Sequence, residues 1–220
     1  MRDVTDQPRA LRAVFFDFGG VVLSSPFEAF NEFEAARGLP KDLIRTVNAT
    51  NPDTNAWAQL ERRQVGFDEF CALFEAECTA LGHRVDAREL MPALAGAIRP
   101  AMVRAIDRCN EAGLITACLT NNFVSWGEPD TERAGEIQDV LRRFAHVVES
   151  SKVGVRKPDP HFYELACDLA QVEPSEVVFL DDLGVNLKPA KAIGMTTIKV
   201  GDPDVAIAEL EQVLGIPLRG

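Results

Sequence analysis

The sequence predicts an α/β protein: a Rossmann-like, doubly wound parallel sheet with an inserted helical cap domain. Short apolar runs that end in polar residues alternate with helical patterns near the start of the chain and again from Arg99 onward. This alternation is typical of parallel strands joined by helices. The stretch between the two regions has helical periodicity and no strand-like alternation. We therefore expect a core formed by residues 1–23 and 98–220 and a helical cap formed by residues 24–97.

The first strand is expected at residues 13–16, an uninterrupted apolar run that leads into Asp17. Such a run suits a strand buried on both faces, and Gly19-Gly20 allows a sharp turn after it. Ligands bind beyond the carboxyl ends of strands in open α/β sheets, so Asp17 is a candidate for chemistry. A capped turn fits the same residues, whereas the glycine spacing fits neither a dinucleotide fingerprint nor a P-loop.

Helical patterns fill the expected cap. The first helical pattern follows Ser24-Ser25-Pro26 and stops at Gly38. The second ends near Gly66, the third ends near Gly82, and the fourth covers residues 87–97. The stripe of Phe27, Phe30 and Phe33 predicts cap core. Trp57 and Trp126 fit either packing or substrate contact, and Arg62-Arg63 fit a solvated face from which one side chain could reach a cleft.

The α/β pattern from Arg99 onward predicts further strands and helices in alternation. We expect strands at residues 114–119, 147–148, 177–180 and 196–200. We expect helices at residues 100–112, 160–170, 187–194 and 205–214, with a further helix that ends at Phe144 after an irregular stretch, 123–135.

Reaction-capable side chains stand at the ends of three expected strands: Asp17, Thr120-Asn121 and Asp181-Asp182. Lys157 precedes a helix between the last two. Taken alone, the polar residues at each strand end could simply form a turn. Together they place several carboxylates on one sheet edge, where the like charges repel unless a cation joins them. So few hard oxygen ligands favour Mg²⁺, which keeps its waters and often binds substrate phosphate.

Four segments in order along the chain resemble the motifs of the haloacid dehalogenase-like hydrolase superfamily, in the subgroup with a helical cap after the first strand. They are residues 16–21, 119–121, 157–158 and 179–182. Within that superfamily, residues 179–190 are similar to the N-terminal phosphatase domain of soluble epoxide hydrolase. The motifs span residues 13–195, so the resemblance covers nearly the whole chain.

The resemblance implies a Mg²⁺-dependent phosphomonoesterase that acts on a small phosphorylated metabolite. Asp17 would be the nucleophile that forms an aspartyl-phosphate. Lys157 would neutralise charge between this carboxylate and the phosphate, and Thr120 and Asn121 would hold phosphate oxygens with it. The metal ligands would be Asp17, the carbonyl of Gly19 and Asp182, supported by Asp181 and Asn186.

The chain departs from the family pattern at Gly19. Most phosphatases of the superfamily have there, two residues after the nucleophile, an aspartate that serves as general acid and then base. Glycine still supplies the backbone carbonyl but no proton, and general acid–base assistance is typically worth ~10²–10⁴-fold. Either the leaving group hardly needs a proton, or another group supplies it, or the chemistry differs.

Two alternatives to a phosphatase therefore stay open. A 2-haloacid dehalogenase-type hydrolase would use the same nucleophile, and its relatives also lack the second aspartate. Against it, Asp181-Asp182 predict a metal site, which is useless for halide displacement. The other alternative is a catalytically weak member of the family that binds a phosphometabolite or a protein partner.

The amino-acid composition limits the binding partners and the cellular location expected for this protein. The formal net charge of −11 disfavours nucleic acid as a partner. Five scattered cysteines predict buried thiols in a reducing compartment. We expect no membrane span and no signal peptide, and hence a cytoplasmic location. The sequence leaves the oligomeric state open.

Overall fold

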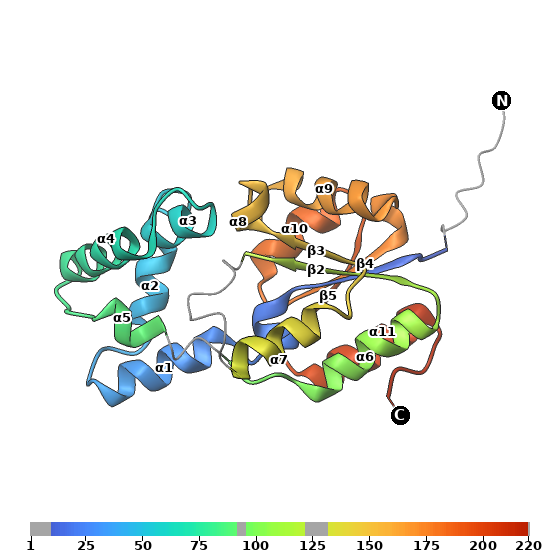
Figure 1. Ribbon diagram of the computed structural model, residues 1–220, viewed down its shortest axis with the longest axis horizontal. Coiled ribbons are helices and arrows are strands. Elements are labelled where there is room, and N and C mark those ends of the chain that lie inside the picture. The colour runs from blue at the N-terminus through green and yellow to red at the C-terminus, as the bar shows by residue number, and fades with distance from the viewer. Residues whose placement is uncertain (1–9, 92–95, 122–131, 220) are drawn as a thin grey trace.

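A five-stranded parallel sheet forms the centre of the computed structural model, which describes residues 10–91, 96–121 and 132–219 (Figure 1). The strand order is β3-β2-β1-β4-β5. The chain thus runs outward from β1 on one side, returns, and continues on the other side, so β1 lies where the winding reverses. This confirms the predicted fold class. The strands are β1 (Ala13–Phe16), β2 (Ile115–Thr120), β3 (His146–Glu149), β4 (Val177–Asp181) and β5 (Thr196–Lys199).

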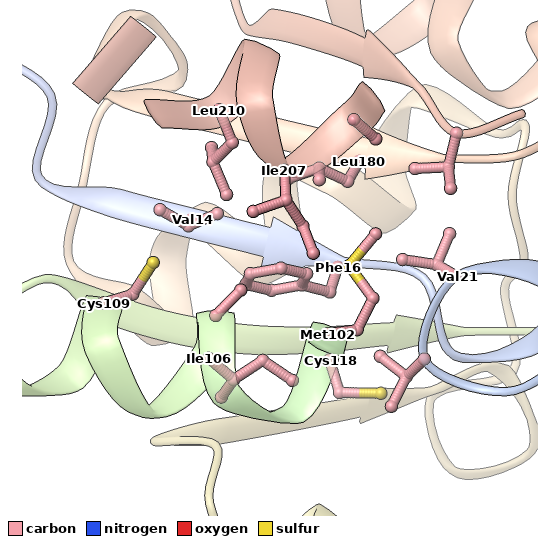
Figure 2. Packing of buried hydrophobic residues seen from close by; sticks show 14 of the residues in the cluster. Val14, Phe16, Val21, Met102, Ile106, Cys109, Cys118, Leu180, Ile207 and Leu210 are labelled. Atoms are coloured by element: carbon pink, nitrogen blue, oxygen red, sulfur yellow. The ribbon is translucent and has the colours of Figure 1, made fainter. Parts of the chain in front are cut away.

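Helices cover both faces of the sheet because the side chains of β1 alternate between two apolar clusters. Val14 and Phe16 pack with residues of one group of helices (Figure 2). Ala13 and Phe15 pack with residues of the other group. The first group is α6 (Pro100–Glu111), α7 (Glu132–Leu141) and α11 (Pro203–Leu214), and the second is α9 (Pro160–Ala170) and α10 (Gly184–Ala192).

Between β1 and α6, the described residues form five α-helices that lie as a group beside the sheet (Figure 1). They share a separate apolar cluster that includes Phe30, Ile44, Phe70 and Phe74. A cluster of their own supports the predicted cap, while the boundaries at residues 23/24 and 97/98 stay a prediction. The chain leaves and re-enters the sheet region side by side, at an antiparallel bridge between Leu23 and Ile98. The helices are α1 (Pro26–Ala36), α2 (Leu43–Ala49), α3 (Ala56–Glu61), α4 (Phe67–Ala80) and α5 (Ala87–Leu90).

Several element boundaries differ from the sequence prediction. Helix α5 is described over Ala87–Leu90, and residues 92–95 of the helix predicted at 87–97 lie outside the described residues. Helix α10 begins at Gly184 rather than Leu187. Helix α7 begins at Glu132, inside the stretch predicted to be irregular, most of which lies outside the described residues. The short helices α2 and α8 (Ser150–Val153) were not predicted. At seven and four residues they are too short to show a clear apolar period.

All five cysteines are buried free thiols, as predicted. No helix among the described residues is long and apolar enough to cross a bilayer.

Helix α2 depends on a buried carboxylate from α1. Glu34 is 1% exposed, and its two oxygens accept hydrogen bonds from the backbone N–H groups of Asp42 at 2.7 Å and Ile44 at 2.8 Å. Asp42 has a positive φ of 62° and caps α2 without a side-chain hydrogen bond. The carboxylate therefore satisfies amides at the start of α2 that the cap residue itself does not.

We expect Glu34→Ala to lower the free energy of unfolding by about 1–3 kcal/mol, because two backbone donors lose a charged acceptor. Glu34→Gln keeps one acceptor oxygen of the same size and should cost less. Urea unfolding, with hydrogen exchange at the Ile44 amide as the local probe, measures both. Equal stability of the alanine variant and the wild type would contradict this role.

Candidate active site

Asp17 lies at the carboxyl end of β1, between the ends of β2 and β4. Its backbone N–H continues the sheet by donating to the carbonyl of Leu180 at 2.8 Å. Its side-chain Oδ1 accepts from the N–H of Phe18 at 2.6 Å. The chain then turns over residues 18–22, and the Leu23 N–H closes the turn by donating to the Phe18 carbonyl at 2.8 Å. The carboxylate is thus oriented by its own backbone.

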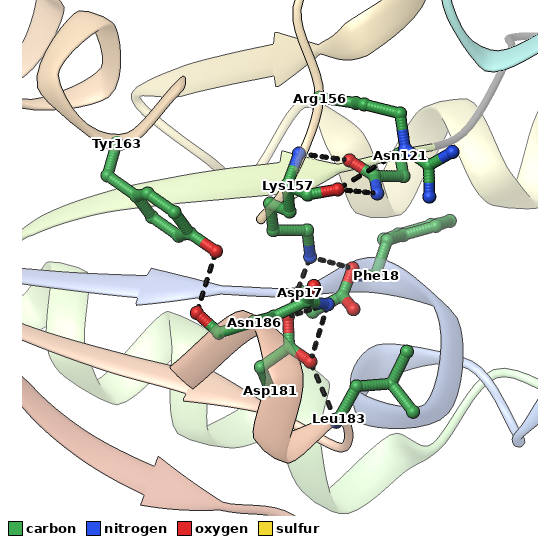
Figure 3. A network of polar contacts seen from close by, with 9 residues as sticks. All are labelled: Asp17, Phe18, Asn121, Arg156, Lys157, Tyr163, Asp181, Leu183 and Asn186. Atoms are coloured by element: carbon green, nitrogen blue, oxygen red, sulfur yellow. Dashed lines mark hydrogen bonds and ion pairs between the residues drawn. The ribbon is translucent and has the colours of Figure 1, made fainter. Parts of the chain in front are cut away.

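Lys157 joins two of the strand ends through its ammonium group (Figure 3). Its Nζ lies 2.9 Å from Oδ1 of Asp17 and 2.7 Å from Oδ2 of Asp181, and its side chain is 1% exposed. Burial disfavours the charged ammonium, but the two carboxylates outweigh this and raise the pKa of Lys157 above its usual value. The lysine is therefore a fixed positive charge beside Asp17.

The backbone of Lys157 is held by the side-chain amide of Asn121. Asn121 Nδ2 donates to the Lys157 carbonyl and Asn121 Oδ1 accepts from the Lys157 N–H, both at 2.8 Å (Figure 3). Both ends of this amide thus fix the lysine segment against the end of β2. The predicted contact of Asn121 with a phosphate oxygen stays a prediction, as does that of Thr120, which lies buried at the same strand end.

Asp181 is surrounded by protein donors. Besides Lys157, it accepts from the N–H of Leu183 at 2.8 Å and from Asn186 Nδ2 at 3.1 Å on each oxygen. The hydroxyl of Tyr163 in turn donates to the Asn186 carbonyl at 2.7 Å (Figure 3). The sequence did not indicate a role for Tyr163, because an aromatic residue on the buried face of a helix is normally assigned to the hydrophobic core. These contacts give Asp181 and Asn186 the task of holding Lys157 in place.

Three carboxylates converge at this edge of the sheet. One ligand oxygen from each of Asp17, Asp181 and Asp182 lies within 4.8 Å of the other two. Burial and then the charge of Asp181 raise the pKa of Asp182 to about 6. Burial raises the pKa of Asp17 well above its usual value, and although Lys157 lowers it, Asp181 and Asp182 raise it further. A single lysine does not offset this cluster, so its donor set fits an additional hard cation.

The approach of Asp182 to the β1 turn requires glycine at position 20. Gly20 has a φ of 78°, and a Cβ placed there would lie 2.2 Å from an oxygen of Asp182. Gly19 differs, since its φ of −70° and ψ of 133° are open to every residue type. Of the two glycines predicted to permit the turn, Gly20 is the one that needs its conformational freedom.

A pocket of about 250 Å³ lies between this strand edge and the cap. The core contributes the predicted residues Asp17, Gly19, Thr120, Asn121 and Asp182. The cap contributes three aromatic side chains, Phe27, Phe30 and Trp57, and four polar ones, Ser24, Asn48, Asn55 and Glu61. Trp57 thus both lines the pocket and packs on Phe70, with ring centroids 4.9 Å apart. Trp126 lies outside the described residues.

Sequence reasoning also missed an ion pair that joins the cap to the core. Oε2 of Glu61, the last residue of α3, lies 2.9 Å from Nε of Arg156, and both side chains line the pocket. The sequence drew attention to the neighbouring Arg62, whose guanidinium donates to the carbonyl of Asp53 at 2.5 Å and is not among the pocket residues. In the sequence, the position of Arg156 directly before Lys157 was the feature that could have indicated a place for Arg156 at the pocket.

The sequence that forms this fold and pocket matches one known protein family. Residues 11–194 match the family model described as haloacid dehalogenase-like hydrolase. This match covers most of the chain, which therefore belongs to the haloacid dehalogenase-like hydrolases, as its motifs predicted.

Curated relatives match nearly the whole chain. It is 35% identical over 217 residues to acyl-CoA dehydrogenase family member 10 of Mus musculus, covering 96% of this chain and 20% of that protein. It is 31% identical over 220 residues to bifunctional epoxide hydrolase 2 of Sus scrofa, covering 95% and 40%. This chain thus spans less than half the length of either relative. It is 25% identical to the sesquiterpene phosphatase astK of Aspergillus oryzae, covering 93% and 97%.

Among solved structures, the chain is similar to a predicted HAD-like family hydrolase from Porphyromonas gingivalis. The TM-score is 0.66, with 18% sequence identity, and the match covers 94% of this chain and 98% of the other. At this identity the similarity establishes the shared fold.

We expect Gly20→Ala to lower the free energy of unfolding by ~2 kcal/mol or more, because it combines a left-handed backbone with a clash against Asp182. Gly19→Ala, in an ordinary backbone conformation, is the matched control and should cost less than half as much. Urea unfolding of the two variants provides the comparison. Equal losses would show that Gly20 is not the constrained position.

Proposed function

We propose that this protein is a Mg²⁺-dependent phosphomonoesterase that forms an aspartyl-phosphate on Asp17. The observation that carries the proposal is the arrangement of Asp17 between the ammonium of Lys157 and the carboxylate of Asp182, on the floor of the pocket between core and cap. A nucleophilic carboxylate, a fixed positive charge and a cation-binding cluster are what transfer of a dianionic phosphoryl group requires. The substrate class is a small phosphorylated metabolite.

Each residue of the pocket floor has a distinct task in this proposal. Both recorded contacts of the Asp17 carboxylate are made by Oδ1, so we assign the attack on phosphorus to Oδ2. Lys157 stays protonated and stabilises the charge that develops on the phosphoryl oxygens. Thr120 and the backbone beside Asn121 are assigned to hold those oxygens, while the Asn121 side chain keeps Lys157 in register.

Mg²⁺ would be held by Asp17, Asp182 and the carbonyl of Gly19. Asp181, whose oxygens already accept from Lys157, Leu183 and Asn186, would support the site from behind. When bound, the ion neutralises negative charge on the carboxylates and on the substrate phosphate.

Halide displacement is the competing reaction for the same nucleophile, and Gly19 favours it by supplying no proton donor. The three converging carboxylates argue against it, because displacement of a halide from carbon uses no cation. A catalytically weak member of the family that binds a phosphometabolite or a protein partner would keep the pocket but would not form the phosphoryl-enzyme. Phosphate release from a panel of phosphorylated metabolites, with and without Mg²⁺, distinguishes the three.

We expect Asp17→Asn to abolish phosphate release and phosphoryl-enzyme formation, because an amide oxygen is a poor nucleophile and Asp17 is the acceptor. Acid-quenched labelling with a ³²P-phosphate ester, followed by peptide mapping, measures the intermediate. Circular dichroism of the variant controls for folding. Near-normal turnover by a folded Asp17→Asn protein would exclude this nucleophile.

We also expect Asp182→Ala to weaken Mg²⁺ binding by at least ~10-fold, since even outer-shell partners of a metal contribute that much. Isothermal titration calorimetry of the protein with MgCl₂ provides the measurement. Asp168→Ala, on the exposed side of α9, removes an equal charge away from the cluster and is the control. If both variants bind Mg²⁺ like the wild type, the ion is held elsewhere.

A further inference from the structure

The proposed reaction needs a proton that the strand edge does not supply. When Asp17 attacks phosphorus, the departing ester oxygen takes the electron pair of the broken P–O bond. An alkoxide leaves slowly unless it is protonated at the same time, and that assistance is typically worth ~10²–10⁴-fold. Gly19 has no side chain to give this proton. Asp17 and Asp182 also line the pocket, but the proposed roles of both require the ionised form.

The remaining carboxyl group among the described pocket residues belongs to Glu61, and it comes from the cap. Its side chain is 16% exposed, beside Arg156. Its backbone carbonyl accepts from the hydroxyl of Ser150 in α8 at 2.7 Å. The end of α3 is therefore attached to the core, and the Glu61 side chain lines the pocket from the cap.

Arg156 places this carboxyl close to the catalytic lysine segment. Its Nε is 2.9 Å from Oε2 of Glu61 and also donates to the Lys157 carbonyl at 3.3 Å. Its Nη1 donates to the carbonyl of Pro52 at 3.3 Å, a second contact with the cap. One arginine thus connects the cap carboxyl to the residue whose ammonium contacts Asp17.

The environment of Glu61 favours an exchangeable proton near neutral pH. Burial raises the pKa of Glu61 to about 7, against the opposing positive charges of Arg156, Lys157 and Arg62. A group with a pKa near the working pH can act both as an acid and as a base.

We propose that Glu61 is the proton donor and acceptor of the phosphatase reaction, supplied by the cap in place of a side chain at position 19. In the first step Asp17 Oδ2 bonds to phosphorus, the ester P–O bond breaks, and the Glu61 carboxyl gives its proton to the departing oxygen, which leaves as an alcohol. In the second step water attacks the phosphorus of the aspartyl-phosphate. The Glu61 carboxylate takes the water proton, and inorganic phosphate and the Asp17 carboxylate are restored. This role rests on the proposed phosphatase function.

A purely structural role for Glu61 makes a different prediction. If the carboxyl only anchors Arg156 and so holds the cap, its loss should slow every substrate by a similar factor. A proton donor should matter in proportion to the basicity of the leaving oxygen. Aryl phosphates, whose leaving anions are stabilised, separate the two roles from alkyl phosphates.

The test is Glu61→Gln, which keeps the size of the side chain and an oxygen for Arg156. We expect kcat/KM for an alkyl phosphate to fall ~10²–10⁴-fold while that for 4-nitrophenyl phosphate changes little. In the wild type, kcat/KM for the alkyl ester should fall as the pH rises through about 7, since the acid form of Glu61 is lost. The variant should lack this limb. Normal 4-nitrophenyl phosphate turnover also shows that the variant is folded.

Two further variants complete the experiment. Glu77→Gln alters another cap carboxyl, which accepts from the N–H of Ala56 at the opposite end of α3, and should leave both substrates unaffected. Gly19→Asp, which the backbone at that position permits, should restore alkyl phosphate turnover in the Glu61→Gln background. Equal losses on both substrates, or none, would overturn the role of Glu61 alone. A wild-type protein that releases phosphate from neither ester would overturn the phosphatase function as well.

Discussion

The buried ammonium of Lys157 is the feature on which the rest of the active site depends. Taking one lysine out of water costs several kcal/mol unless partners surround it, and here Asp17 and Asp181 do so at 2.9 and 2.7 Å. Each partner is itself held: Asp17 by the Phe18 N–H, Asp181 by Asn186. Loss of one carboxylate would leave the lysine buried with half of its compensation. Asp17, the proposed nucleophile, is therefore positioned by the same contacts that make burial of the lysine tolerable.

The parallel sheet makes this arrangement possible. The partners of Lys157 come from β1 and β4, which are adjacent and in register from Ala13 with Val177 to Phe16 with Leu180, so their next residues are neighbours by construction. The same geometry brings the like charges of Asp17, Asp181 and Asp182 together, which fits the proposed binding of a cation. One constraint, strands that end at one edge, thus produces both the contacts of Asp17 and Asp181 with Lys157 and the cluster of three carboxylates.

The sequence predicted the fold class because apolar residues recur differently along buried parallel strands and along amphipathic helices. It also placed Asp17, Lys157 and Asp182 at one edge of the sheet, because the end of a buried strand can be recognised where an apolar run meets polar residues. It could not predict that the Asn121 amide grips the Lys157 backbone, since nothing in a Thr-Asn pair distinguishes that contact from substrate binding. Tyr163 and Arg156 were missed for a similar reason: their partners, Asn186 and Glu61, are remote in sequence. Cap packing decides which residue of α3 faces the pocket, and a helix that short has no clear apolar face to read.

The absence of a carboxyl group at Gly19 and the presence of the Glu61 carboxyl in the pocket are related in the proposed mechanism. A carboxyl two residues after Asp17 would belong to the core alone, so it would be present whether or not the cap covered the pocket. A carboxyl at the end of α3 is in place only while Ser150 and Arg156 bind the cap to the core. Acid–base chemistry carried by Glu61 would then depend on contact between the cap and the core, and it would take place near the buried Lys157 charge. On this reasoning the aromatic cap residues Phe27, Phe30 and Trp57 line the same pocket into which Glu61 would deliver the proton.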